Sequence, residues 1–195
     1  MSAVSLPTTY FDDVYRANED PWSFETSPYE RAKYEATIAA LPNAKYRNAF
    51  EIGCSIGVLS EMLAQRCDQL LSVDASELPL KAARQRMAPY KHVVVSRMSI
   101  PSEFPDNQFD LIVLSEVGYY LSLRDLEQAR QKMVEHVEKE GHLLLVHWTP
   151  FVPDYPLTGD QVHEEFLKMA GEDKPLTHLL NQRTDKYRLD LFKKK

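Results

Sequence analysis

The residues best suited to chemistry lie in a run of small and acidic residues, Glu51-Ile-Gly-Cys-Ser-Ile-Gly57. Small residues at positions 53, 55 and 57 let the backbone turn tightly and approach a ligand closely. A helix that begins directly after such a turn offers unpaired N–H groups and the positive end of its dipole. This pattern predicts a loop that holds a nucleotide-like cofactor.

A second acidic residue, Asp74, follows Gly53 by 21 residues and ends the next apolar run. A carboxylate in that position can accept hydrogen bonds from both hydroxyls of a ribose. A dinucleotide-binding G-x-G-x-x-G fingerprint needs glycine at positions 53, 55 and 58, where this sequence has Gly53, Ser55 and Val58. Gly53 and Asp74 together favour a ribose-containing cofactor, and the missing glycines at positions 55 and 58 argue against NAD as that cofactor.

Alternating strands and helices must position these residues. Hydrophobic patterning predicts strands at 49–53, 69–74, 92–96, 109–115 and 142–148, and helices at 57–66, 78–87, 123–138 and 160–170. Gly141 is expected to close the helix at 123–138, and residues 176–192 are expected to form an antiparallel hairpin with its turn near 184–186. This alternation is typical of an α/β fold with a mostly parallel sheet, in which ligands bind at the carboxyl ends of the strands.

Composition limits the class of protein. A chain of 195 residues with 44% hydrophobic and 27% charged residues is an ordinary globular protein of about one domain. Its net charge of -6 argues against a nucleic-acid partner, and no apolar stretch is long enough to span a membrane. Cys54 and Cys67 have neither disulfide nor metal-site spacing, and residues 1–8 lack a secretory pattern, so we expect a cytoplasmic protein without a metal.

The pattern Glu-x-Gly-x-x-x-Gly at 51–57 resembles the first motif of class I S-adenosylmethionine-dependent methyltransferases, with Ser55 where that family often has glycine. Four segments are similar to the nodulation protein S (NodS)-like branch of this family. They are residues 10–34, Phe50-Glu-Ile-Gly-Cys, Phe109-Asp-Leu-Ile-Val-Leu-Ser-Glu-Val-Gly-Tyr-Tyr-Leu121 and Gly141-His-Leu-Leu-Leu. The resemblance spans roughly residues 10–150.

This resemblance implies a Rossmann-like class I methyltransferase sandwich. Its sheet would be mostly parallel and seven-stranded, with helices on both faces and a C-terminal antiparallel hairpin. Residues 1–195 would then form a single methyltransferase domain with three parts. These parts are a helical lid at 1–45, a cofactor-binding core at 46–149, and an acceptor-site loop, helix and hairpin at 150–195.

The resemblance also assigns residues to S-adenosyl-L-methionine, whose product is S-adenosyl-L-homocysteine. Gly53 and Gly57 would bracket the methionine part, and Asp74 with Ala75 would hold the ribose. The lid would supply Trp22, together with Arg31 or Lys33 for the methionine carboxylate, only one of the two pointing inward. Residues assigned to the rest of the cofactor site are Glu51, Cys54, Met98, Ser99 and Ser115.

The acceptor is expected beside residues 115–120, which follow the fourth strand. An amine must lose its proton before it can attack a methyl group, and Glu116, His147 and His163 are the candidate bases. Tyr119, Tyr120 and Trp148 are expected to line the acceptor site, although either tyrosine could instead seal a helix against the sheet. The absence of an Asn/Asp-Pro-Pro-Tyr motif argues against a DNA base as acceptor.

Characterised members of the family N-methylate the deacetylated amino sugar of a lipo-chitooligosaccharide. The resemblance therefore predicts methyl transfer to a small molecule, with the nitrogen of an amino sugar or a related amine as the favoured target. Two alternatives remain: an NAD(P)-binding oxidoreductase of the same fold, or a non-catalytic partner protein that retains the fold. We expect a monomer or homodimer that binds a small-molecule acceptor and neither nucleic acid nor membrane.

Overall fold

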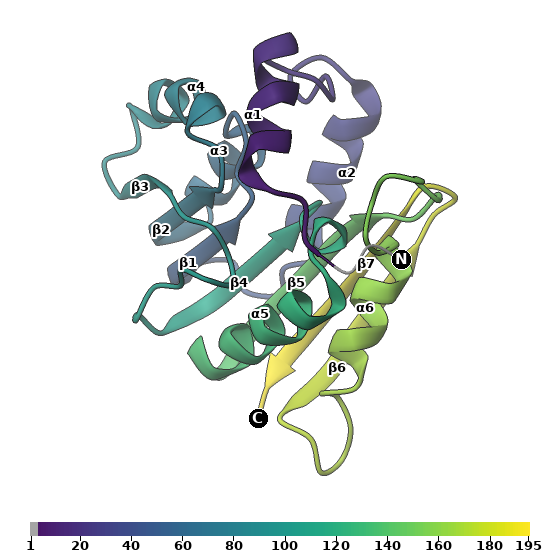
Figure 1. The fold of residues 1–195 in the computed structure, drawn as a ribbon. Coiled ribbons are helices and arrows are strands. Elements are labelled where there is room, and N and C mark those ends of the chain that lie inside the picture. Colours follow the sequence, from purple (N-terminus) through teal and green to yellow (C-terminus); the bar gives the residue numbers. More distant parts are fainter. Residues whose placement is uncertain (1–3) are drawn as a thin grey trace. The chain divides into compact units, whose positions relative to one another are not determined.

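The computed structural model describes residues 4–195, which divide into two compact units. One unit is Pro7–Ser99. The other is Ile100–Lys195 together with the residues that precede Pro7. Each unit combines strands and helices in alternation, as the sequence predicts (Figure 1).

The unit Pro7–Ser99 has a three-stranded parallel arrangement in the order β3-β2-β1. Helices α3 and α4 pack on β2, while α1 contacts α4 and α2 contacts α3 (Figure 1). Ser76 caps α4 by accepting a hydrogen bond from the Leu78 N–H. In chain order the elements are α1 (Thr8–Ala17), α2 (Pro28–Ala39), β1 (Tyr46–Ile52), α3 (Val58–Ala64), β2 (Cys67–Asp74), α4 (Glu77–Met87) and β3 (Val93–Arg97).

The second unit has the strand order β4-β5-β7-β6. Strands β4 and β5 are parallel, and β7 is antiparallel to both β5 and β6, so the predicted C-terminal hairpin is confirmed. Helix α6 contacts β5, β7 and α5 (Figure 1). The elements are β4 (Phe109–Ser115), the 3₁₀ turn η1 (Gly118–Tyr120), α5 (Leu123–His136), β5 (Val137–Trp148), α6 (Gly159–Leu167), β6 (Leu176–Arg183) and β7 (Tyr187–Lys194).

The role predicted for Gly141 is wrong. Helix α5 ends at His136 and β5 begins at the next residue, so Gly141 lies inside a strand. A Cβ atom at Gly141 would lie 2.9 Å from the Glu138 carbonyl oxygen and 3.2 Å from the Cα of Asp110. The β4–β5 register also shifts between Phe109 and Leu111. Glycine is needed here because an irregular strand brings two backbones unusually close, not because a helix ends.

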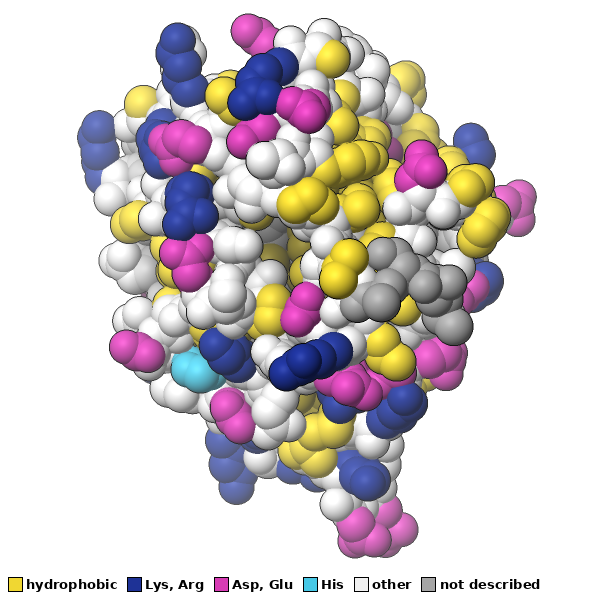
Figure 2. All heavy atoms as spheres, viewed as in Figure 1, with side chains coloured by type: hydrophobic (Ala, Val, Ile, Leu, Met, Phe, Trp, Pro, Cys, Tyr) yellow, Lys and Arg dark blue, Asp and Glu magenta, His cyan; other side chains and the backbone are white. Residues whose placement is uncertain are grey.

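Basic and acidic side chains are interspersed over the face shown in Figure 2. Many of them form ion pairs within the chain, such as Arg84 with Glu77. Across residues 4–195 no helix has both the length and the apolar character needed to cross a membrane. In the same residues, no group of three or more His, Cys, Asp and Glu side chains is arranged to hold a metal ion. Cys54 and Cys67 are buried and form no disulfide.

Candidate functional site

The turn between β1 and α3 has the strained backbone that its small residues predict. Gly53 and Gly57 have φ values of 85° and 82°, and Ser55 between them also has a positive φ of 49°. Glycine adopts this left-handed conformation readily, whereas a serine does so at a cost. A Cβ atom at Gly57 would lie 3.2 Å from the Cα of Ala83 on α4, so the turn also packs tightly against that helix.

Asp74 at the end of β2 is bonded to this turn. One carboxylate oxygen accepts the Ser55 N–H at 3.0 Å, and the other accepts the Ser76 N–H at 3.0 Å. Burial raises the pKa of Asp74 to about 6, although the N–H groups of Ser76, Ser55 and Ala75 partly offset it. The structure therefore holds an acidic side chain beside a left-handed turn, as the sequence predicts.

Glu51 lies near the end of β1, two residues before Gly53, and is only 1% exposed. The hydroxyls of Ser60 on α3 and Ser72 on β2 both donate to one of its carboxylate oxygens, each at 2.6 Å. Burial raises the pKa of Glu51 to about 7 despite these two bonds. Glu51 thus ties together the three elements that carry the turn. Burial likewise raises the pKa of the neighbouring Cys54 thiol, which therefore stays protonated at neutral pH.

Helix α1 contacts the turn through residues that sequence analysis did not single out. The Tyr15 hydroxyl donates to the Ser55 hydroxyl at 2.6 Å, and the Ser76 hydroxyl donates to Asp12 at 2.6 Å. The Trp22 ring meets the Tyr15 ring edge-on at 5.7 Å. Tyr15 and Asp12 both fall within the aromatic and acidic segment 10–34, and that segment was the available signal.

The two cations expected in the lid have opposite environments. Lys33 is 2% exposed and its Nζ lies 2.9 Å from the Glu30 carboxylate. The Arg31 side chain is 82% exposed and pairs with Glu35 one helical turn away. Two residues assigned to the rest of the cofactor site follow β3: Met98 donates its N–H to the Asp74 carbonyl at 2.9 Å, and Ser99 after it is half-buried.

In the second unit, Glu116 joins the ends of two strands. It follows Ser115, the last residue of β4, and has a positive φ of 58°. The Tyr119 hydroxyl and the Trp148 N–H both donate to one Glu116 oxygen, at 2.6 Å and 2.9 Å. The Glu116 side chain is half-buried.

Three tyrosine rings pack together beside Glu116. Tyr119 stacks on Tyr155 with ring centres 4.9 Å apart, and Tyr120 meets both rings edge-on at 4.7 Å and 4.8 Å. Tyr155 comes from the Pro-rich segment 150–160, where no periodic pattern could have indicated its position. The Leu157 N–H also donates to the Tyr119 carbonyl at 3.2 Å, so this segment is tied to the turn after β4.

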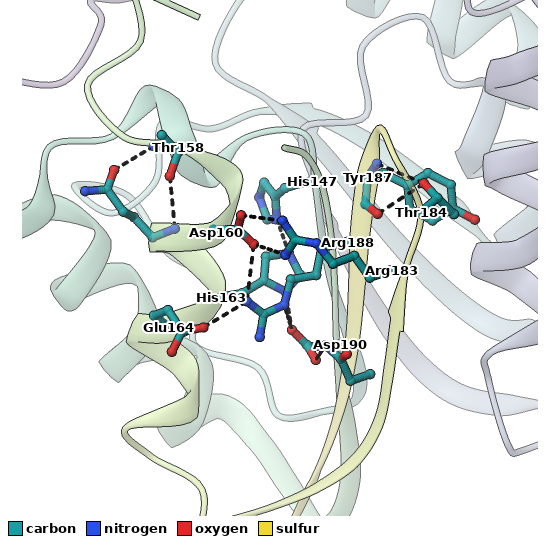
Figure 3. Close-up of polar contacts among 12 residues, drawn as sticks. His147, Thr158, Asp160, His163, Glu164, Arg183, Thr184, Tyr187, Arg188 and Asp190 are labelled. Carbon is teal, nitrogen blue, oxygen red and sulfur yellow. Dashed lines mark hydrogen bonds and ion pairs between the residues drawn. The ribbon is translucent and has the colours of Figure 1, made fainter. Parts of the chain in front are cut away.

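His147 and His163 are both fully buried, and each uses both ring nitrogens within this unit. His147 Nε2 accepts the Gly118 N–H at 3.1 Å, and its Nδ1 lies 3.1 Å from His163 Nε2. His163 Nδ1 lies 2.6 Å from the Asp190 carboxylate (Figure 3). Burial lowers the pKa of His163, which keeps its ring neutral. Asp190 lies 27 residues beyond His163, and nothing in the sequence indicated this contact.

The structure therefore distributes the expected residues over both units. The unit Pro7–Ser99 holds the turn, Asp74, Ala75, Met98 and Ser99, together with Trp22, Arg31 and Lys33 of the expected lid. The second unit holds Ser115, Glu116, the tyrosines, Trp148 and both histidines. Of the three candidate bases, Glu116 retains exposed surface while His147 and His163 have none.

Comparisons with known proteins place this chain among its relatives. The family model described as Nodulation protein S (NodS) matches residues 13–147. Nodulation protein S of Rhizobium tropici is 29% identical over 130 residues, which are 66% of this chain and 55% of that protein. The chain thus spans little more than half the length of this curated relative.

Two solved structures are similar over most of the chain. A candidate methyltransferase from Pseudomonas syringae is 36% identical, with a TM-score of 0.74 over 85% of this chain and 99% of that one. The N-methyltransferase NodS from Bradyrhizobium japonicum WM9, solved with S-adenosyl-L-homocysteine, is 26% identical. Its TM-score is 0.81 over 96% of this chain and 99% of that one.

These matches confirm the predicted Rossmann-like methyltransferase fold, because the likeness extends over nearly the whole chain, including its C-terminal antiparallel strands. The sequence resemblance is confirmed as well, since the family model covers well over half of the residues. This chain belongs to the nodulation protein S family.

Proposed function

We propose that this chain transfers the methyl group of S-adenosyl-L-methionine to the nitrogen of a small-molecule amine, with an amino sugar as the favoured acceptor. The observation that carries the proposal is the Asp74 carboxylate, held by backbone N–H groups beside the left-handed turn at 53–57. The NodS structure solved with S-adenosyl-L-homocysteine supports the same choice of cofactor.

The residues of the unit Pro7–Ser99 suit that cofactor. Asp74 accepts from the ribose hydroxyls, with Ala75 beside it, and the strained turn lets its backbone approach the methionine part. Met98 and Ser99 follow β3 next to Asp74 and take the adenine. Of the two lid cations, Lys33 is the one that points inward, and it would have to exchange its pair with Glu30 for the methionine carboxylate, whereas Arg31 is exposed. When bound, the cofactor supplies a methyl group made electrophilic by its positively charged sulfur.

Glu116 is the base in this proposal. A protonated amine has no lone pair, so its proton first passes to a Glu116 carboxylate oxygen, and the neutral nitrogen then attacks the methyl carbon. The new N–C bond forms as the S–C bond breaks, and the electron pair of that bond stays on sulfur. His147 and His163 are less suitable, because all four of their ring nitrogens already bond within the second unit.

The tyrosines next to Glu116 suit a cationic acceptor. Aromatic faces attract an ammonium group, and a nearby carboxylate adds a direct charge interaction. The half-buried Tyr155 provides the accessible ring, with the buried Tyr119 and Tyr120 packed against it, and the Trp148 N–H helps to hold Glu116 in place. The proposal keeps the expectations of a cytoplasmic monomer or homodimer that acts on neither nucleic acid nor membrane lipid.

Calorimetric titration of the purified protein with S-adenosylmethionine, S-adenosylhomocysteine and NADH tests the cofactor first. Micromolar binding of the first two alone supports the proposal. Binding of NADH alone would make the chain an oxidoreductase, and binding of none of the three would favour a non-catalytic partner protein.

The acceptor and the base are tested by release of S-adenosylhomocysteine with glucosamine, a deacetylated chitooligosaccharide and ethanolamine as probes. Glu116→Gln should lower kcat by about 100-fold, within the range typical of a lost general base, and leave cofactor affinity unchanged. Glu127→Gln, at an exposed position on α5, is the matched control. Full activity in Glu116→Gln would rule out Glu116 as the base.

A further inference from the structure

A buried chain of hydrogen bonds crosses the second unit from a backbone amide to a carboxylate. It runs from the Gly118 N–H through His147 and His163 to Asp190, with heavy-atom distances of 3.1, 3.1 and 2.6 Å. Figure 3 shows the part that includes His147, His163 and Asp190. The members of the chain come from η1, β5, α6 and β7. Both imidazoles and the Asp190 carboxylate are fully buried.

Only one arrangement of protons satisfies this chain. The Gly118 amide can only donate, so His147 Nε2 must accept and the His147 proton must be on Nδ1. His147 Nδ1 then donates to His163 Nε2, which places the His163 proton on Nδ1, facing Asp190. A second proton on either ring would set two donors against each other. The chain ends at an amide that does not release its proton, so it orients groups and does not conduct protons.

At the end of the hydrogen-bond chain opposite Gly118, Asp190 stays ionised and accepts hydrogen bonds only. Burial alone would raise the pKa of Asp190, but hydrogen bonds from His163 and Asn181 and the charge of Arg188 hold it well below its usual value. Its other contacts are with His178 Nε2 at 2.7 Å and Arg188 Nε at 2.7 Å. Arg188 is in turn paired with Asp160 and Glu164 (Figure 3).

The chain supports Glu116 from both sides. Gly118 lies two residues after Glu116, and His147 immediately precedes Trp148, whose N–H binds the Glu116 carboxylate. The fit around Gly118 is tight: a Cβ atom there would lie 3.0 Å from His147 Nε2 and 2.5 Å from Val162 on α6. A change in the His147 ring would therefore be transmitted to the backbone that carries Glu116.

We infer that His163 and Asp190 are positioning residues for methyl transfer, acting through a single tautomer of His147 that anchors Gly118 and so aims Glu116. This inference rests on the proposed function in that it needs Glu116 to meet the acceptor. Asp190 was not among the site residues expected from the sequence. His163 was expected as a base, and the inference gives it a positioning role instead.

The test is ¹⁵N NMR of the histidine rings of the whole protein, without cofactor or acceptor, together with hydrogen exchange of the Gly118 amide. In the wild type at pH 7, both His147 and His163 should carry their protons on Nδ1. His163→Leu removes the acceptor for the His147 Nδ1 proton, so that N–H is left unsatisfied and the ring is no longer held in place. The Gly118 amide, which donates to the same ring, should then exchange at least about tenfold faster. His163→Gln, which can accept from His147 and donate to Asp190, should restore slow exchange of the Gly118 amide.

Turnover measured with glucosamine then shows whether the contact between His147 and His163 affects activity. His163→Leu should lower kcat at least about tenfold without changing the affinity for S-adenosylmethionine, because small misplacements of reacting groups are costly. His163→Gln should recover most of the loss. Arg183→Gln is the matched control, because Arg183 lies on the same hairpin as Asp190, forms an exposed ion pair with Asp160 of α6, and is not a member of the hydrogen-bond chain.

A wild-type His147 protonated on Nε2, or an unchanged Gly118 amide in His163→Leu, would overturn the inference. If His163→Leu does not fold, Asp190→Asn replaces it, since a neutral amide cannot satisfy all four donors that now face Asp190. Failure to bind S-adenosylmethionine would contradict only the proposed function, because the NMR measurements need neither cofactor nor acceptor.

Discussion

Two carboxylates on neighbouring strands, the buried Glu51 and the half-buried Asp74, differ in their hydrogen-bond donors. Glu51 accepts from two internal hydroxyls, so its hydrogen-bonding capacity serves the packing of β1, β2 and α3. Asp74 accepts from the backbone N–H groups of Ser55 in the turn and of Ser76 after β2, and these bonds fix the direction of its carboxylate. The difference in partners suits Glu51 to supporting the turn and Asp74 to recognising the ligand.

Asp74→Ala should weaken S-adenosylmethionine binding at least tenfold, or about 1.4 kcal/mol, through loss of charge-assisted bonds to the ribose. Calorimetric titration measures this, with Asp68→Ala as control, because Asp68 lies on the same strand in an exposed pair with Lys45. Wild-type affinity should also fall as the pH drops through about 6, where Asp74 gains a proton. Equal affinity in the Asp74 and Asp68 variants would remove Asp74 from the site.

At the scale of elements, the turn from β1 to α3 depends on backbone conformation more than on side chains. Its three small residues, Gly53, Ser55 and Gly57, all have positive φ, and α1 braces it through the bond from Tyr15 to Ser55. The turn is therefore strained locally and stabilised by contacts from a helix that precedes it by some forty residues.

Gly57→Ala should lower the free energy of unfolding by about 1–3 kcal/mol, because alanine would be held at a left-handed φ and pressed against α4. Gly171→Ala is the control, since Gly171 also has a positive φ but lies between α6 and β6. Both variants should be less stable in urea denaturation, and only Gly57→Ala should lose affinity for S-adenosylmethionine. Loss of affinity in both would show a general effect of instability.

For the whole molecule, buried acids make stability depend on pH. Burial raises the pKa of Glu51 to about 7, above its unfolded value, so the folded state binds this proton more tightly. The resulting stabilisation is complete below pH 4.5 and is lost as the pH rises through about 7. His163 acts in the opposite direction, because a lowered pKa stabilises the folded state fully only at pH values above the pKa of the unfolded chain.

Glu51→Gln should remove the contribution of Glu51 while keeping an acceptor for Ser60 and Ser72. The difference in unfolding free energy between variant and wild type should therefore grow by about 3 kcal/mol in favour of the variant from pH 4.5 to pH 8. Urea denaturation at several pH values measures it, and Glu127→Gln should show no such trend. A difference independent of pH would mean that Glu51 ionises in the folded state as readily as in the unfolded chain.

The sequence alone was enough for the alternation of strands and helices, the turn at 53–57, Asp74 at the end of a strand, and the family. These features depend on short-range patterning: hydrophobic periodicity, capping residues and the restricted backbone of small residues act over a few positions. Gly141 is the exception, because the same residue can end a helix or admit a close neighbour, and its neighbour Asp110 is distant in sequence.

Only the tertiary structure decided which candidate side chains are accessible and what they bind. The sequence predicted that one of Arg31 and Lys33 would point inward, and the packing of α2 selects Lys33. It presented His147, His163 and Glu116 as equivalent bases, whereas folding buries both histidines in a chain that ends at Asp190. The burial and the partner of a side chain are set by residues brought together from distant strands and helices, and local patterning carries no information about them.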